Sequence, residues 1–214
     1  MVVDSAGIGG IFWTANDALD AGLNAGVGEV FVLDGSYGPV VMDQAAMTLR
    51  CGSPKWTLTS QGTLFKGDGT NAALHTSNGG GQIIENCGFY SAPGGAGGGA
   101  HAVRLGGGGN PAYGIKFRYN FILDADDACI NMNEGGGNGQ GQVYNNTIHD
   151  CDGVGIDTGV STDGVNIVDN HVTSGGTGIQ LISGANVNVV VGNATDSGIT
   201  NSGSGNIVTG NVQY

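Results

Sequence analysis

The second half of the chain repeats a short alternating pattern of apolar and polar residues that contains an asparagine. The aligned segments read FRYNFI, VYNNTI, IVDNHV, VVGNAT and VTGNVQ. Their asparagines form one column at intervals of 18 to 26 residues: Asn120, Asn146, Asn170, Asn193 and Asn211. A repeat of this length is too small to bury its own apolar face, so it must stack on its neighbours. The pattern therefore predicts a solenoid.

A second column runs through the segments AHAVRL, DACINM, VGIDT, TGIQL and SGITN. It aligns Val103, Ile130, Ile156, Ile179 and Ile199. We expect these side chains to point inward and to touch their equivalents one coil away, on parallel strands about 4.8 Å apart. The asparagine column is expected to form a structural ladder of hydrogen bonds between coils. Because IIENCGF puts Cys87 in that column, the ladder should begin near residue 82.

Residues 13–26 depart from this pattern. The segment WTANDALDAGLNAG has N-cap residues, early aspartates and an apolar face with Leu19 and Leu23, which predicts a short amphipathic helix. Such a helix would cover the open end of the solenoid. We therefore expect one domain over 1–214, with an N-terminal cap over 1–29 and coils over 30–214. The final segment NIVTGNVQY shows no closing element, so we expect a partner to cover that end.

The composition fits many short strands joined by glycine-rich turns. The 44 glycines show no G-X-Y period, and 39% apolar against 11% charged residues is typical of a folded chain. Six basic residues against 18 acidic ones give a net charge of −12, and the basic residues are scattered. Nucleic-acid binding is therefore not expected. No signal peptide or membrane segment is visible.

The four cysteines, Cys51, Cys87, Cys129 and Cys151, have no C-x-x-C spacing and no histidine at zinc-site distance. We expect reduced, buried thiols and no metal.

The helix-like ANDALDAGLNAG followed by VGEVFVLDGSYGPVVM resembles the entry segment of the right-handed parallel β-helix superfamily. That superfamily includes pectate lyases, polygalacturonases, pectin methylesterases and bacteriophage tailspike or fibre proteins. The pieces GIQLISG and NIVTGNV resemble its coils. The resemblance implies an all-β, single-stranded, right-handed parallel β-helix, and it covers nearly the whole chain. It does not by itself name a reaction.

The enzymes of that superfamily are matched only in part. Asp126 and Asp127 in DADDACI resemble the paired aspartates of polygalacturonases, but the companion G-H-G and R-I-K segments are absent. Lys116 and Arg118 are the only basic residues in the second half that could serve a lyase. Arg104 or Arg118 could supply the cation of a pectin methylesterase, whose other signature segments are missing.

One group of carboxylates is the candidate site. Overlaying FILDADDACINM on TIHDCDGVGIDT places Asp124 over Asp150, Asp126 over Asp152, and Asn131 over Asp157. The candidate glycan- or cation-binding residues are therefore Asp124, Asp126, Asp127, Asp150, Asp152 and Asp157. Aspartates that cap wet turns are the favoured interpretation. Calcium binding, glycan binding and hydrolysis stay open as alternatives.

The function expected from the sequence is structural and recognitional. We expect a virion surface protein, such as a decoration, spike or fibre protein, that contacts glycans and lies on the virion or at an extracellular surface. Expected partners are copies of the chain, with a trimer implied by resemblance to phage fibres, or other virion proteins. The alternative is a polysaccharide lyase or glycoside hydrolase.

Overall fold

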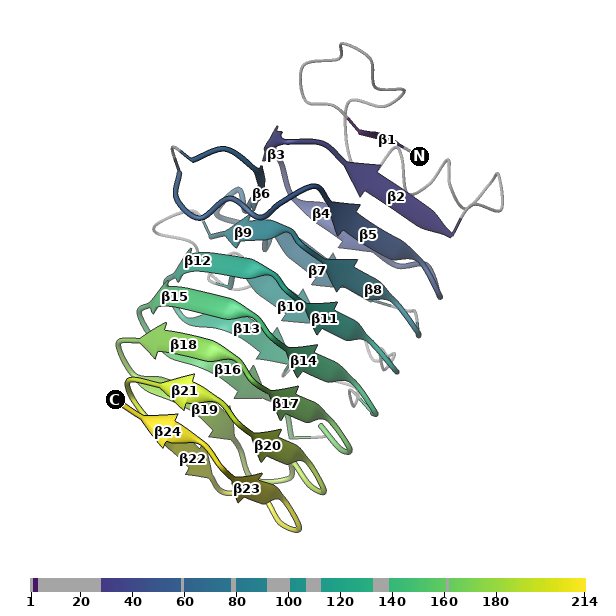
Figure 1. The fold of residues 1–214 in the computed structure, drawn as a ribbon. Coiled ribbons are helices and arrows are strands. Elements are labelled where there is room, and N and C mark those ends of the chain that lie inside the picture. Colours follow the sequence, from purple (N-terminus) through teal and green to yellow (C-terminus); the bar gives the residue numbers. More distant parts are fainter. Residues whose placement is uncertain are drawn as a thin grey trace.

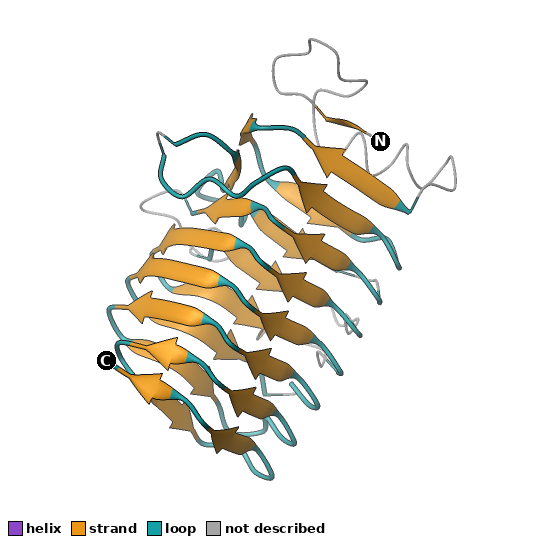
Figure 2. Ribbon diagram, in the orientation of Figure 1, coloured by secondary structure: helices purple, strands orange, loops and turns teal. Residues whose placement is uncertain are grey.

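The computed structural model describes residues 2–3, 28–58, 60–77, 80–91, 101–106, 113–132, 139–160 and 162–214, with only the backbone of residues 2–3. Every regular element in these ranges is a β-strand (Figure 2). The strands stack in successive coils along one axis, and the C-terminus lies at the far end of the stack from β1 (Figure 1). The predicted helix over 13–26 lies outside the described residues and stays a prediction.

Three parallel sheets form the faces of the stack. The first contains, in order, β1 (Val2–Val3), β2 (Glu29–Val32), β5 (Thr48–Cys51), β8 (Ile83–Glu85), β11 (Lys116–Arg118), β14 (Gln142–Tyr144), β17 (Asn166–Val168), β20 (Val189–Val191) and β23 (Ile207–Thr209). The second contains β3 (Gly35–Tyr37), β6 (Thr63–Lys66), β9 (Gly88–Tyr90), β12 (Phe121–Ala125), β15 (Thr147–Cys151), β18 (His171–Ser174), β21 (Ala194–Thr195) and β24 (Val212–Gln213). The third contains β4 (Val40–Met42), β7 (Leu74–Thr76), β10 (Val103–Leu105), β13 (Ala128–Met132), β16 (Val154–Thr158), β19 (Thr177–Leu181) and β22 (Ile199–Asn201). From β2 to β22 the chain visits the three sheets in the same order in every coil, an arrangement compatible with a parallel β-helix.

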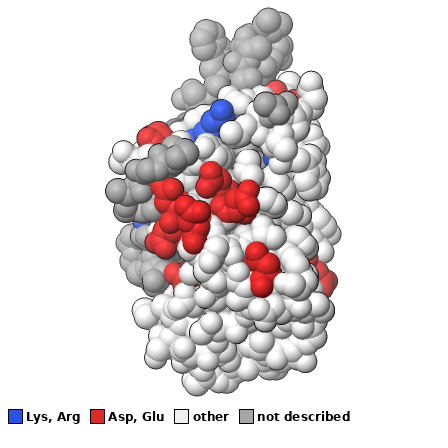
Figure 3. All heavy atoms as spheres, turned by 90° about the vertical axis from the view of Figure 1, so that its left-hand side faces the viewer, with Lys and Arg blue, Asp and Glu red and all other residues white. Residues whose placement is uncertain are grey.

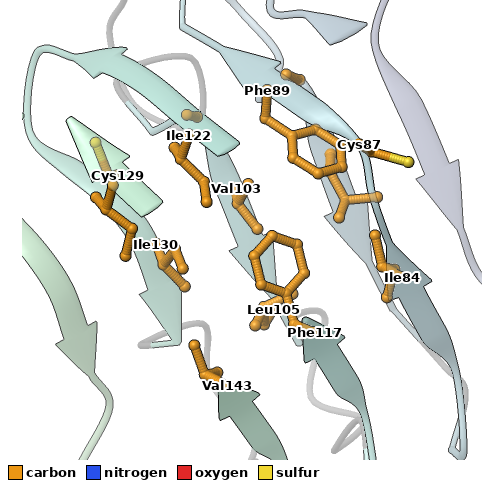
Figure 4. Close-up of a cluster of buried hydrophobic side chains, with 14 of the residues drawn as sticks. Ile84, Cys87, Phe89, Val103, Leu105, Phe117, Ile122, Cys129, Ile130 and Val143 are labelled. Atoms are coloured by element: carbon orange, nitrogen blue, oxygen red, sulfur yellow. The ribbon is translucent and has the colours of Figure 1, made fainter. Parts of the chain in front are cut away.

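The core is a set of apolar columns that run along the stack. The predicted column is confirmed on the third sheet, where Val103 pairs with Ile130, Ile130 with Ile156, Ile156 with Ile179, and Ile179 with Ile199. The first four of these side chains are fully buried, and the fifth packs against them partly buried. Figure 4 shows side chains from all three sheets meeting in one interior. Each fully buried isoleucine stabilises the fold by about 1.5–3 kcal/mol relative to an exposed one.

The asparagine ladder is also confirmed, at the corner between the first and second sheets. The Oδ1 of Asn146 accepts the backbone N–H of Asn120 at 3.0 Å, and its Nδ2 donates to the Phe117 carbonyl at 3.0 Å. The same contacts recur one coil later, where Asn170 accepts from the Asn146 N–H and donates to the Val143 carbonyl. The complete run of ladder residues is Cys87, Asn120, Asn146, Asn170, Asn193 and Asn211.

The backbone before each ladder residue turns through the left-handed region. Asn86, Tyr119, Asn145 and Asp169 have φ between 53° and 59°, and glycine takes this position at 192 and 210. For a bulky residue such as Tyr119, this backbone conformation costs about 1 kcal/mol or more in conformational free energy. The turn is kept in this conformation because the buried ladder hydrogen bonds stabilise it by more than the strain costs.

The cysteines correct one prediction. They are buried as expected but not reduced, since Cys51 is bonded to Cys87 and Cys129 to Cys151. Stacking brings residues one coil apart to Cα separations of 5.1 and 5.6 Å, which suit a disulfide. Both bridges therefore tie one coil to the next.

We predict that replacing both Cys129 and Cys151 with alanine lowers the free energy of unfolding by about 3 kcal/mol, because the bridge closes a loop in the unfolded chain. Urea denaturation of protein made under oxidising conditions measures this. Reductant should lower the free energy of unfolding of the double variant further, because it breaks the remaining Cys51–Cys87 bridge. Four reactive thiols in the denatured, unreduced wild type would contradict the prediction.

Candidate functional site

The predicted carboxylates gather at the corner where the second sheet passes into the third. Leu123 pairs with His149 and Ala125 with Cys151, which places Asp124 beside Asp150 as the sequence predicted. Both aspartates have left-handed backbone, with φ of 59° and 58°. We call the group Asp124, Asp126, Asp127, Asp150 and Asp152 the acidic corner. Figure 3 views this side of the molecule and shows acidic side chains gathered on it.

Burial and mutual repulsion act on the carboxylates of the acidic corner. The pKa of Asp124 is raised above its ordinary value, first by burial. The negative charges of Asp152, Asp126 and Asp150 raise it further, in that order. Burial also raises the pKa of the Tyr90 hydroxyl, with added contributions from Asp124 and Asp126. The stacking that favours asparagine and isoleucine columns thus opposes ionisation in an aspartate column.

The acidic corner is not uniformly wet, contrary to the sequence-based interpretation. The side chains of Asp127 and Asp150 are 64% and 68% exposed. In contrast, Oδ2 of Asp126 is buried and has no hydrogen-bond partner within the described residues. The local setting therefore differs from one carboxylate to the next.

Asp157 lies apart from the turns, on the outer face of the third sheet. It pairs with Asn131 in the preceding coil, as predicted, and with Gln180 in the next. Burial, followed by the charge of Asp127, raises the pKa of Asp157 to about 6. Its Oδ1 atom is buried and finds no hydrogen-bond partner in the part of the chain that the structure describes. This carboxyl is the one best suited to hold a proton near neutral pH.

A buried histidine joins the acidic corner to the third sheet. The Nδ1 of His101 accepts the Ala128 N–H at 3.3 Å and lies 3.9 Å from Asp127. Its Nε2 lies 3.0 Å from the side-chain amide of Asn131. His101 therefore holds Asn131 in place beside Asp157.

A groove that the sequence did not reveal lies on the outer face of the second sheet, next to the acidic corner. It encloses about 480 Å³ and is lined by Trp56, Thr57, Leu58, Phe121, Leu123, His149 and Asp150. The Trp56 ring lies 5.2 Å from the Phe121 ring, centroid to centroid, yet the residue is 56% exposed. Asp150 belongs to both features, and its Oδ2 lies 2.8 Å from Nδ1 of His149. We call this feature the Trp56 groove.

The Trp56 groove joins residues that are far apart in the sequence. Trp56 comes from the connection between β5 and β6, whereas His149 and Asp150 come from β15. An exposed tryptophan in the polar segment SPKWTLTS was the one available signal. Periodicity alone could not place it over β12.

Among the described residues, no three histidine, cysteine, aspartate or glutamate side chains are grouped so as to hold a metal ion. The same residues contain no helix with the length and apolarity to cross a membrane.

No known protein family, curated protein or solved structure matches the chain.

The raised pKa of Asp157 predicts a pH-dependent loss of stability. The folded pKa of about 6 exceeds the unfolded value of 3.8, so the folded state binds the proton more tightly. Stability from this group falls as the pH rises from about 4 to 6, and the penalty is complete above that range. Asp157→Asn should therefore be more stable than the wild type at pH 7.5, by about 1–2 kcal/mol after allowance for solvent screening, and equally stable near pH 4. Urea denaturation at both pH values measures this.

Asp68→Asn supplies a control of opposite sign. The pKa of Asp68 is lowered by hydrogen bonds, first from the Asn71 side chain and then from the backbone of Asn71 and Thr70. Its ionised form therefore stabilises the folded state, and the amide should reduce stability above pH 4. Equal stabilities of Asp157→Asn and the wild type at pH 7.5 would refute the assignment.

Proposed function

We propose that the chain is a structural and recognition module at an extracellular or virion surface, and that it binds glycans without cleaving them. The observation that carries this proposal is the Trp56 groove, which places an exposed aromatic ring beside the carboxylates of the acidic corner. Sugars offer an apolar ring face to aromatic side chains and hydroxyls to carboxylates. Concave sites that combine apolar walls with a few polar groups suit small ligands of this kind.

The scaffold supports a recognition role because neighbouring coils are held together at several points. Buried ladder bonds link each coil to the next, and two disulfides add covalent ties. Such a scaffold presents a preformed surface, so little conformational entropy is lost when a ligand binds.

The location is proposed from the disulfides and from the resemblance. Disulfides persist in oxidising surroundings, such as secreted proteins and virion surfaces, and are rare in the cytosol. Membership of the right-handed β-helix superfamily and a virion role are proposed from the sequence resemblance alone.

A glycoside hydrolase or polysaccharide lyase is the alternative, and Asp157 is the observation that favours it. Hydrolysis needs one carboxyl that stays protonated and a second that stays ionised nearby. Asp157, with its pKa of about 6, could serve as the acid, and exposed Asp127 contributes to that shift.

We predict that the isolated chain binds at least one member of a panel of acidic, neutral and cationic oligosaccharides, and releases no reducing ends or unsaturated products from them. Glycan-array binding and product assays at pH 5 and 7.5 measure both. The matched variant is Asp157→Asn, which should bind as the wild type does. Turnover by the wild type that the folded Asp157→Asn protein lacks would establish the enzyme instead.

We propose that the functional form of the chain is a homo-oligomer, and the resemblance to phage fibres implies a trimer. The support for the oligomer is the apolar surface of the last described coil, where Ile207, Val212 and Tyr214 are 56%, 61% and 57% exposed. We predict that light scattering across a wide concentration range finds an assembly of the chain. Val212→Asp should weaken that assembly, and a stable monomer at every concentration would refute it.

A further inference from the structure

The lining of the Trp56 groove combines apolar side chains with one carboxylate. Trp56 packs on the nearly buried Phe121, which restricts the orientation of the indole while leaving much of it exposed. Leu58 and Leu123 extend the apolar lining, and Asp150 adds a carboxylate to it. The volume of about 480 Å³ falls within the range of small-ligand sites.

The charge around the groove selects against anions. Among the described residues that line the groove there is no lysine or arginine, whereas Asp150 is one of them. Asp124 lies close enough to Asp150 and Asp152 to interact with both by charge. The aromatic ring adds to this preference, because the face of an indole attracts cations. An acidic glycan would meet repulsion from both the corner and the chain's net charge of −12.

A peptide is a poorer occupant than a sugar. The second sheet beneath the groove is paired on both sides of β12 and β15, so it offers no free strand edge to which an extended peptide could add. An apolar ring wall with hydrogen-bonding groups at its end suits a pyranose ring that carries an amine.

We propose that the Trp56 groove binds a cationic amino-sugar oligosaccharide, with a sugar ring against Trp56 and its ammonium group at Asp150. This inference rests on the proposed glycan-binding function and names the ligand class of that site. His149, whose Nδ1 lies 2.8 Å from Oδ2 of Asp150, also lines the groove. The Asp150 backbone N–H is in turn bonded to Oγ1 of Thr173 at 3.3 Å.

The test is isothermal titration calorimetry of the full chain with three hexasaccharides. They are β-1,4-linked glucosamine, its N-acetylated form with the same linkage, and a galacturonate oligomer of the same length. We expect affinity to fall in that order, and the glucosamine affinity to fall further with added salt. Trp56→Ala should weaken glucosamine binding about tenfold, in line with the loss of the contact between the sugar ring and the indole, and Trp56→Phe should recover part of it.

Asp150→Asn separates the charge from the shape of the site. It should reduce glucosamine affinity to that of the N-acetylated oligomer and leave the latter unchanged. Asp152→Asn is the matched control, since Asp152 belongs to the acidic corner but does not line the groove. It should have a smaller effect. Circular dichroism and urea denaturation confirm that each variant is folded.

The outcomes distinguish this inference from the function on which it rests. Glycan binding that is unaffected by Trp56→Ala, or that favours the galacturonate oligomer, would overturn the inference and leave glycan recognition standing. Equal binding of a lysine-rich peptide of the same charge would overturn the sugar as occupant. A full glycan panel without any binder would overturn the proposed function itself.

Discussion

From Cys87 to Asn211, the structure depends on the hydrogen bonds that tie the backbone of one coil to an asparagine of the next. Each buried ladder side chain satisfies a backbone N–H in the preceding coil and donates to a backbone carbonyl. A buried polar group left without a partner costs about 1–3 kcal/mol, so the coils that the ladder joins are held to one alignment. A slip of one residue would break the ladder and move each inward side chain to the outer face. The ladder therefore sets the register on which the apolar columns rely.

That register has opposite consequences for different side chains. Stacked isoleucines bury apolar surface, and stacked asparagines satisfy one another. Burial raises the pKa of Asp124, and repulsion from the neighbouring aspartates raises it further, which limits such a column to the surface. The acidic corner spans only two coils, since the next coil has Gly175 and Gly176 at the corresponding turn. The repeat thus tolerates an aspartate pair where solvent is available and the backbone can turn into the left-handed region.

Recognition is proposed where the chain departs from its repeat. Most corners between the first and second sheets are tight turns, but the connection between β5 and β6 is long and carries Trp56 across to Phe121. The regular coils contribute the part of the groove on the second sheet, which the ladder and the disulfides stabilise. The irregular connection contributes Trp56 and its neighbours. A ligand surface built in this way can vary without disturbing the core. This separation agrees with the general tendency of loops on rigid scaffolds to carry binding sites.

Much of the architecture could be predicted from the sequence because a stacked repeat makes its register visible. The columns of Asn120 and Asn146, and of Ile130 and Ile156, recur at the coil period, and neighbouring coils must align wherever that period holds. The same reasoning placed Asp124 beside Asp150 and Asn131 beside Asp157. Only the tertiary structure decided the rest: which cysteines pair, how deeply Asp157 is buried, and what covers the second sheet. Those features depend on the path of non-repeating connections and on the surface they cover, and neither leaves a period in the sequence.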